Sequence, residues 1–430
     1  MKPVREILTF VIATIIFVFA LLLAAIIPRD AIKEHMLESA EYLCEKEVFY
    51  NVSKTDFSSR IDRYADSILL GIAWQYDSQN PLPSVMNSAY YHNDKKNENE
   101  NLLEAVQYDK SSNLQYLRYW HGSIAVVRPL LVFMPVKGIY IINGIVLFLL
   151  TCLLGVILFK KKYYMPLVGL IIGLVINSVW YVPFSLEYSW TFLLMILFGI
   201  TVTILTEKRK REWYGAAFLC FGMVTCFFDF LTTETITLTV PALLLFCIET
   251  KENDDFKIKR FVRMPIAWGI GYVSTWLTKW LLASIVLHEN VMPYVTGHVS
   301  ERIGGNEFVN PGFADYILGA LGRNLRCLLP FNYGAAGVII GVAIIILYIY
   351  LAYVYRGKNI DKSKAALYLC AAAVPYIRFI VLHNHSYLHY FFTYRAQLGM
   401  VFAMTLLLLD GLKVWESLGN VRRHGKKANL

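Results

Sequence analysis

The sequence predicts an all-α protein that crosses a membrane about ten times. The first observation is composition, because 57% of the 430 residues are hydrophobic and the mean hydropathy is +0.47. The second is charge: 17% of the residues are charged, compared with about 25% in an average soluble domain. The third is that these charges lie between apolar runs close to the roughly 20 residues that cross the hydrocarbon core as a helix. These observations exclude a soluble globular fold.

The apolar runs define the expected membrane spans. They lie at 8–27, 138–159, 165–182, 189–206, 213–231, 236–249, 265–287, 334–355, 365–382 and 396–412. The sixth run is short and contains Pro241. The first run follows a basic start and could be a cleaved signal peptide. It is about 20 residues long and lacks a clear small-x-small cleavage site, which favours an uncleaved first span.

Basic residues are concentrated in alternate breaks between these runs. They occur at 160–162, 208–211, 251–263 and 356–364 and in the tail at 413–430, whereas the breaks at 183–188 and 232–235 contain no Lys or Arg. The positive-inside rule then predicts cytoplasmic N- and C-termini and an even number of spans. The net charge of +9 thus has a topological explanation, and nucleic acid is not an expected partner. We expect a multi-pass protein of the plasma membrane.

This topology predicts two large extracytoplasmic loops. The expected order is a first span within 1–27, an outer loop at 28–137, spans two to seven at 138–287, a second outer loop at 288–333, the last three spans at 334–412 and a basic cytoplasmic tail at 413–430. In the first loop, apolar residues of the 61–74 segment recur at helical spacing, which predicts an amphipathic helix. The polar 92–101 segment is predicted to be mobile.

Five ionisable residues fall within or beside the apolar runs: Asp229, Lys279, Arg378, Arg395 and Arg128. A charge inside a membrane is a functional candidate because it is unfavourable unless it is paired or faces water. The topology places all five near the outer side, where four cations and one carboxylate suggest a cavity for an anion, with Lys279 lining it. Alternatively, Arg395 and Arg128 could snorkel to headgroups, Arg378 could pair with Asp229, and Asp229 could cap the turn that follows it.

A histidine-rich stretch, HNHSYLHYFFTYR at 383–395, lies at the outer ends of the last two spans. His385 and His389 share one helical face and His383 is close by, so a metal site is one interpretation. No Cys or carboxylate joins them in the stretch, and the seven cysteines of the chain show no close pairing. We therefore expect no metal; the histidines either belong to an interfacial aromatic belt or contact an anion or a sugar.

Two stretches of the first outer loop, IDRYADSILLGIAW at 61–74 and YWHGSIAVVRPLL at 119–131, give the chain a resemblance to a known superfamily. The layout is similar to the GT-C polytopic glycosyltransferases, which use polyprenyl-phosphate sugars. Members have one span, a large outer loop in which an acidic residue opens an amphipathic helix, and a His-Pro-Pro-Leu type stretch leading into span two. The second stretch departs from that pattern, and the first lacks the common Asp-Glu pair.

The resemblance implies a GT-C-like fold and transfer of a sugar from a polyprenyl-phosphate donor to a glycan, lipid or protein acceptor. Asp66 matches the acidic residue of the family helix and is the first candidate for the general base; Asp62 is the second. The lipid phosphate and the sugar would be held by Lys279, Arg378, Arg395, Arg128, His383, His385, His389, His121 and Asp229. No cofactor is indicated with certainty, and a divalent cation stays an open alternative.

Two other classes of function fit parts of the sequence. A transporter or flippase for a lipid-linked or anionic glycan would also use an outer cationic cavity, but such proteins often have a midplane site and an internal repeat. Neither is evident here. A non-catalytic scaffold of the cell envelope would leave the charged residues dispersed on different faces.

Overall fold

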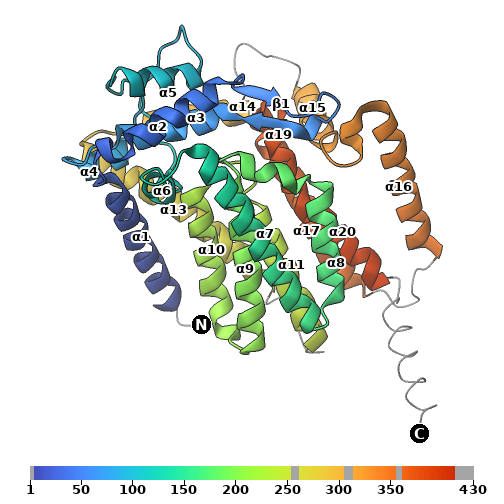
Figure 1. Ribbon diagram of the computed structural model, residues 1–430. Coiled ribbons are helices and arrows are strands. Elements are labelled where there is room, and N and C mark those ends of the chain that lie inside the picture. The colour runs from blue at the N-terminus through green and yellow to red at the C-terminus, as the bar shows by residue number, and fades with distance from the viewer. Residues whose placement is uncertain (1–3, 253–260, 305–312, 355–360, 412–430) are drawn as a thin grey trace.

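The computed structural model describes residues 4–252, 261–304, 313–354 and 361–411. Most of these residues are helical. The strands within these ranges form one small antiparallel sheet of β1 (Phe49–Asn51) and β2 (Arg60–Asp62), in which Phe49 lies opposite Asp62. Figure 1 shows a bundle of long helices covered at one end by shorter ones. The predicted all-α class is thus confirmed.

Seven helices within the described residues are long and apolar enough to cross a membrane. They are α1 (Val4–Ala25), α7 (Val136–Lys160), α9 (Ser189–Glu207), α13 (Arg263–Leu287), α17 (Lys362–Val381) and two longer segments, Phe331–Val354 and Tyr390–Gly411, which contain α16 (Gly334–Val354) and α20 (Leu398–Gly411). These helices are compatible with an integral membrane protein, and they coincide with seven of the predicted spans.

The predicted count of about ten spans is not confirmed. The other three runs do form helices, but short ones: α8 (Tyr164–Ile176) has 13 residues, α10 (Tyr214–Phe228) has 15 and α11 (Ile236–Glu252) has 17. At 1.5 Å per residue, α8 covers about 20 Å, less than the roughly 30 Å hydrocarbon core. It ends at Ile176; Ser178, two residues further on, has a left-handed backbone and precedes a 3-10 turn, η2 (Val179–Phe184).

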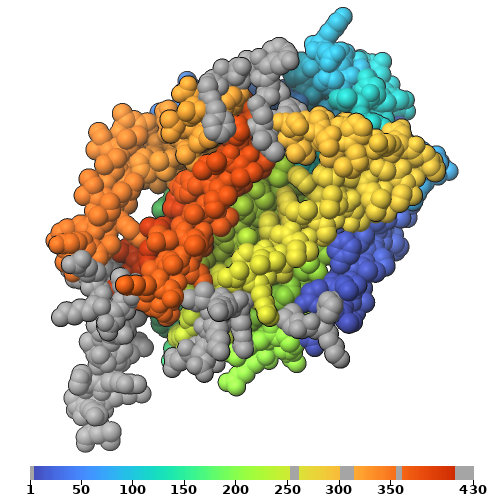
Figure 2. All heavy atoms as spheres, turned by 180° about the vertical axis from the view of Figure 1, so that it is seen from behind, coloured from blue at the N-terminus to red at the C-terminus, as the bar shows by residue number. Residues whose placement is uncertain are grey.

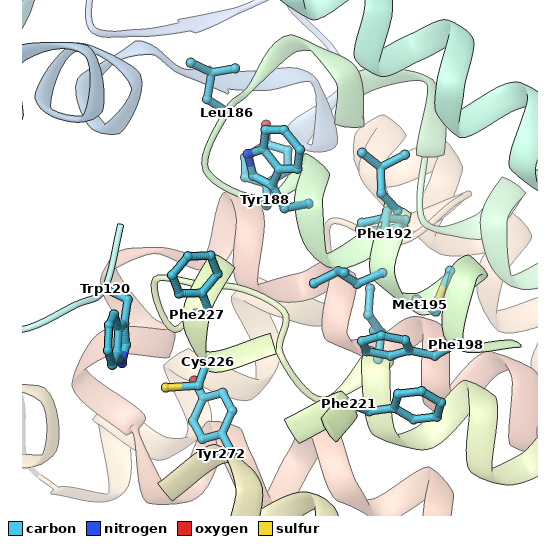
Figure 3. Close-up of a cluster of buried hydrophobic side chains, with 14 of the residues drawn as sticks. Trp120, Leu186, Tyr188, Phe192, Met195, Phe198, Phe221, Cys226, Phe227 and Tyr272 are labelled. Carbon is cyan, nitrogen blue, oxygen red and sulfur yellow. The ribbon is translucent and has the colours of Figure 1, made fainter. Parts of the chain in front are cut away.

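The core of the bundle is tightly packed at α10 and α13. A Cβ atom added to Gly222 would lie 2.0 Å from the carbonyl oxygen of Trp268, and one added to Gly271 would lie 2.1 Å from that of Leu219. Small residues at such crossings allow helix backbones to approach closely in membrane proteins. Large buried side chains, among them Phe221 and Phe227, fill the adjoining space (Figure 3).

The basic breaks at 160–162 and 208–211, together with Lys251, lie at one end of the bundle, near the N-terminus in Figure 1. Contacts between them are Arg5 Nη1 with the Glu212 carbonyl (3.2 Å), Lys161 with Glu207, Arg211 with Glu249 (2.9 Å) and Lys251 Nζ with the Lys162 carbonyl (2.8 Å). The predicted cytoplasmic tail at 413–430 lies outside the described residues. Segments that the sequence assigns to one side therefore share one end of the bundle.

The first loop covers the opposite end with α2 (Arg29–Cys44), α3 (Arg63–Gln75), α4 (Pro81–Asn87), α5 (Glu98–Gln107) and α6 (Ile124–Leu130). The predicted amphipathic helix is α3, and Asp62 caps it by accepting a hydrogen bond from the Ala65 amide (2.9 Å). The 92–101 segment differs from its prediction. Its second half begins α5, because Asn97 and Glu100 form a capping box.

The second loop lies over the same end. It contains α14 (Met292–Gly304), α15 (Phe313–Leu325) and η4 (Phe331–Tyr333), and α14 and α15 both pack on α18 (His383–Leu388) of the histidine stretch. Seen from behind, α13 and α17 run along one face of the bundle, while α16 stands apart at its edge (Figure 2). Residues of both loops therefore lie close to the helix ends at this end of the bundle.

Candidate functional site

A cavity of about 410 Å³ lies where both loops meet the bundle. This volume is within the roughly 300–1,000 Å³ range of small-molecule sites. Its polar lining comprises Asp62, Glu187, Arg118, His121, His298, Asn384, His385 and His389; its aromatic lining comprises Phe49, Tyr64, Tyr116, Tyr119, Phe230 and Phe392. Two carboxyl groups, one guanidinium, several imidazoles and aromatic rings from distant parts of the chain thus surround one space.

The acidic wall consists of Asp62 and Glu187. Asp62 is 3% exposed at the start of α3, and Glu187 is 8% exposed in the segment before α9. The two side chains are hydrogen-bonded to each other. Burial raises the pKa of Asp62 to about 7, although the Ala65 amide opposes that rise. This wall can therefore accept a proton near neutral pH.

The cationic group of the lining is Arg118. Its guanidinium donates to the Tyr116 hydroxyl (2.6 Å) and lies 3.1 Å from His298 Nδ1, which joins the first loop to α14. It also packs on the Tyr116 ring, 4.3 Å from the ring centroid. Trp280 of α13 fixes the backbone by donating to the Arg118 carbonyl (3.2 Å). Arg118 was not predicted, because it lies outside every apolar run.

His121 lines the cavity as a neutral acceptor. Burial lowers its pKa to about 3. Its Nε2 lies 2.9 Å from the Tyr116 carbonyl, which only accepts, so Nε2 carries the proton. Nδ1 therefore presents a lone pair and has no partner among the described residues. The next residue must be small, because a Cβ at Gly122 would lie 2.4 Å from the Phe227 carbonyl.

The histidine stretch contributes two of its three imidazoles. His385 and His389 line the cavity with their rings 4.8 Å apart, as their predicted spacing requires. His383 does not line it; its Nδ1 lies 3.2 Å from the Ile380 carbonyl, and its ring packs on Tyr316. Across the part of the chain that the structure describes, no group of three or more His, Cys, Asp or Glu residues could hold a metal ion.

Asp66, the first candidate for the base, lies beneath the acidic wall rather than in the lining. Its side chain is fully buried and accepts hydrogen bonds from the Leu186 amide (2.8 Å), the Ser185 hydroxyl (3.3 Å) and the Tyr140 hydroxyl. Burial raises its pKa to about 8. Asp62 lines the cavity and Asp66 does not, so the geometry favours Asp62 as the candidate base. This is the reverse of the order that the sequence suggested.

Lys279 and Arg128 are bound to the ends of helices. Lys279 Nζ donates to the Val85 and Met86 carbonyls at the end of α4 (2.9 and 3.0 Å). The guanidinium of Arg128 donates to the Ala73 carbonyl near the end of α3 (2.5 Å) and to two further carbonyls, those of Ile27 (2.8 Å) and Tyr76 (3.2 Å). Neither side chain lines this cavity. Both are fully buried, so Arg128 does not snorkel to headgroups.

Arg378 and Asp229 also have protein partners. The carboxylate bonded to Arg378 is that of Glu234 (2.8 Å) rather than that of Asp229, and Arg378 also donates to the Ser386 hydroxyl (3.1 Å). Asp229 accepts from the Leu231 and Thr232 amides (2.8 and 3.0 Å), which is the turn-capping alternative. Neither residue lines the cavity.

Arg395 is fully buried and does not snorkel. Its guanidinium donates to the Phe391 carbonyl (3.0 Å) and lies over the rings of Tyr188 and Tyr394, 4.4 and 4.7 Å from their centroids. It is outside the cavity lining. Of the predicted site residues, the cavity therefore brings together Asp62, His121, His385 and His389.

Three charged or titratable residues of the polar lining were missed: Glu187, Arg118 and His298. Each lies in a break or an outer loop, where one charged or titratable residue among other polar residues gives no local signal. Comparison of the chain with protein-family models, curated proteins and solved structures finds no match.

Proposed function

We propose that the protein is a membrane glycosyltransferase that moves a sugar from a polyprenyl-phosphate donor to an envelope acceptor on the extracytoplasmic side. One observation carries the proposal: a carboxylate at the start of the first-loop helix shares a cavity with Arg118 and a group of histidines. Displacement at a sugar carbon with a phosphate leaving group needs these two kinds of group, a base and a fixed cation.

The location of the cavity supports an extracytoplasmic reaction. Its lining comes from the end opposite the basic breaks at 160–162 and 208–211. Short basic breaks face the cytoplasm in multi-pass proteins. A donor whose phosphate lies among the outer headgroups would therefore reach the cavity from the membrane. We place the N- and C-termini in the cytoplasm and the protein in the plasma membrane.

In the proposed reaction, Asp62 is the general base. Its carboxylate takes the proton of an acceptor hydroxyl while that oxygen forms a bond to the anomeric carbon of the sugar. The bond between this carbon and the phosphate oxygen breaks, and its electron pair leaves with the lipid phosphate. The raised pKa of Asp62, about 7 through burial, suits a base that works near neutral pH.

Arg118 and the histidines form the leaving-group side. The guanidinium of Arg118 can donate to phosphate oxygens in a planar fork. Nδ1 of His121 can accept a hydrogen bond from a sugar hydroxyl, and the aromatic lining offers flat apolar faces to the ring. We assign none of these roles to Lys279, Arg378, Arg128 or Arg395, because they lie outside the cavity lining.

The layout supports a GT-C-like fold as part of the proposal. A first long helix, α1, precedes a large loop with amphipathic helices, and the second loop packs over the same end. About ten spans would result if α8, α10 and α11 crossed the membrane together with the polar turns at their ends. A transporter is less well supported, because every residue of the lining lies at one end of the bundle.

The decisive experiment compares cells with and without the protein. Mass spectrometry of polyprenyl-phosphate sugars and envelope glycans should show an accumulated lipid donor and a missing glycan modification when the gene is deleted. Asp62→Asn should reproduce both changes with about 100-fold or greater loss of transfer, since asparagine still caps α3. Unchanged lipid and glycan profiles in the deletion strain would remove the proposal.

A further inference from the structure

We infer that Asp62 and Glu187 act as one carboxyl pair that holds a single proton, with Glu187 as the positioning residue that sets the protonation of the base. This inference rests on the proposed function for the role of Asp62. The pair itself is a property of the folded protein and can be measured without any transfer reaction.

The contact between the two side chains requires a proton. They are hydrogen-bonded to each other, and both are buried at the edge of the cavity, 3% and 8% exposed. A carboxylate only accepts hydrogen bonds, so one of two bonded carboxyl groups must be protonated. Two carboxylates this close cannot both ionise readily, because like charges in a buried site repel strongly. The pair therefore carries one negative charge near neutral pH.

Asp66 explains how Glu187 reaches this position. Asp66 lies one turn after Asp62 on α3 and accepts from the Leu186 amide (2.8 Å) and the Ser185 hydroxyl (3.3 Å). The same Ser185 hydroxyl accepts from the Glu187 amide (3.0 Å). Through Asp66, α3 thus holds the 185–187 segment in place. Its cap residue, Asp62, contacts the side chain of Glu187. Asp66 therefore acts on the base through the backbone of this segment.

Several other charged or titratable groups face the pair from the elements packed around it. They are Arg60 on β2, Asp66 on α3, Tyr188 before α9, and His385 and His389 across the cavity. Arg60 favours the ionised form of Asp62, while the charge of Asp62 raises the pKa of Asp66. The single negative charge of the pair is thus balanced by Arg60, whose guanidinium packs on the Phe49 and Phe391 rings (5.1 and 4.8 Å).

Replacing Glu187 changes the base in a defined direction. In Glu187→Gln the neighbour is neutral, and its amide can donate to an ionised Asp62. The variant has no second carboxyl group to share a proton with Asp62, so Asp62 should lose its proton about one pH unit or more below the pH at which the wild-type pair loses its last proton. Asp62 stays ionised to lower pH but becomes a weaker base.

The test uses the full chain in detergent and dicyclohexylcarbodiimide, which reacts with protonated carboxyl groups in apolar sites. Peptides are analysed by mass spectrometry after labelling between pH 5 and pH 9. In the wild type, labelling of Asp62 or Glu187 should persist to near neutral pH. In Glu187→Gln, labelling of Asp62 should end about one pH unit or more lower. Glu38→Gln on the exposed face of α2 is the matched control and should leave the profile unchanged.

Two results would overturn the inference. The first is wild-type labelling, summed over Asp62 and Glu187, that ends at the same pH as the labelling of Asp62 in Glu187→Gln. The second is protection of the wild-type pair by millimolar Mg²⁺ and its reversal by EDTA, since the pair would then hold a cation. If Glu187→Gln does not fold, Glu187→Asp should shift the profile in the same direction by less. Because labelling needs no substrate, a failure of the proposed glycosyl transfer would leave this result standing.

Discussion

The cavity and the anchoring points of the two large loops use buried charge in different ways. At the anchoring points, Lys279 and Arg128 direct their donors at carbonyl oxygens of the chain, and Arg378 donates to the Glu234 carboxylate and the Leu231 carbonyl. In the cavity, Asp62 and Arg118 have protein partners but also line an open space. Burial of a charge in the membrane region therefore does not identify a substrate site. The useful criterion is whether the charge lines a space that a ligand can enter.

The physical reason for the anchoring cations lies in the helix ends. The last carbonyls of a helix have no partner within it, and its C-terminus carries a partial negative charge. α1, α3 and α4 all end in the buried zone where the first loop meets the bundle, so each end needs a donor. Lys279 supplies α4, and Arg128 supplies α3 and the Ile27 carbonyl just after α1. These residues hold the loop in place over the cavity.

The largest expected effect on stability is at Arg378. Arg378→Met leaves Glu234 as an unpaired buried carboxylate, which should destabilise the protein by about 3–5 kcal/mol. Thermal unfolding in detergent measures the loss. The double variant with Glu234→Gln should lose less than Arg378→Met alone, because no uncompensated charge remains. Equal losses in the single and double variants would show that the ion pair is not the source of the effect.

Two arginines of the first loop, Arg118 and Arg128, provide the sharpest test of the comparison. Arg118→Gln should reduce sugar transfer about 100-fold, as the loss of one charged donor at a leaving group does, with little change in unfolding temperature. Arg128→Gln should lower the unfolding temperature and leave transfer per folded molecule within about twofold, since its partners are carbonyls of the loop. The comparison would fail if the two variants behaved alike in both measurements.

A smaller effect is expected at Lys279. Lys279→Met keeps the length of the side chain but leaves the Val85 and Met86 carbonyls without their donor. A buried unsatisfied acceptor costs about 1–3 kcal/mol, which thermal unfolding detects. Hydrogen exchange should rise in α4 and not in α5, because Lys279 binds the end of α4 and not that of α5. Full protection of α4 in the variant would contradict the anchoring role.

Much of the fold follows from the sequence because long apolar runs have few alternatives in a bilayer. An apolar run must form a helix so that its backbone groups are bonded internally, and each predicted span coincides with a helix. The 61–74 helix was predicted from its apolar spacing and is α3. The lengths of α8, α10 and α11 were not predicted, because apolar composition does not reveal where turn residues such as Ser178 end a helix.

What the sequence by itself determined is the helical class, the positions of the long apolar helices and the amphipathic helix capped by Asp62. Those features depend on composition and periodicity along the chain. Only the tertiary structure decided which ionisable residues share a cavity, since the lining comes from segments as distant as Asp62, Glu187 and His389. Asp66 and Lys279 have the residue types that the sequence led us to expect in a site. Whether such a side chain meets a carbonyl of the chain or an open space depends on packing, which no local pattern encodes.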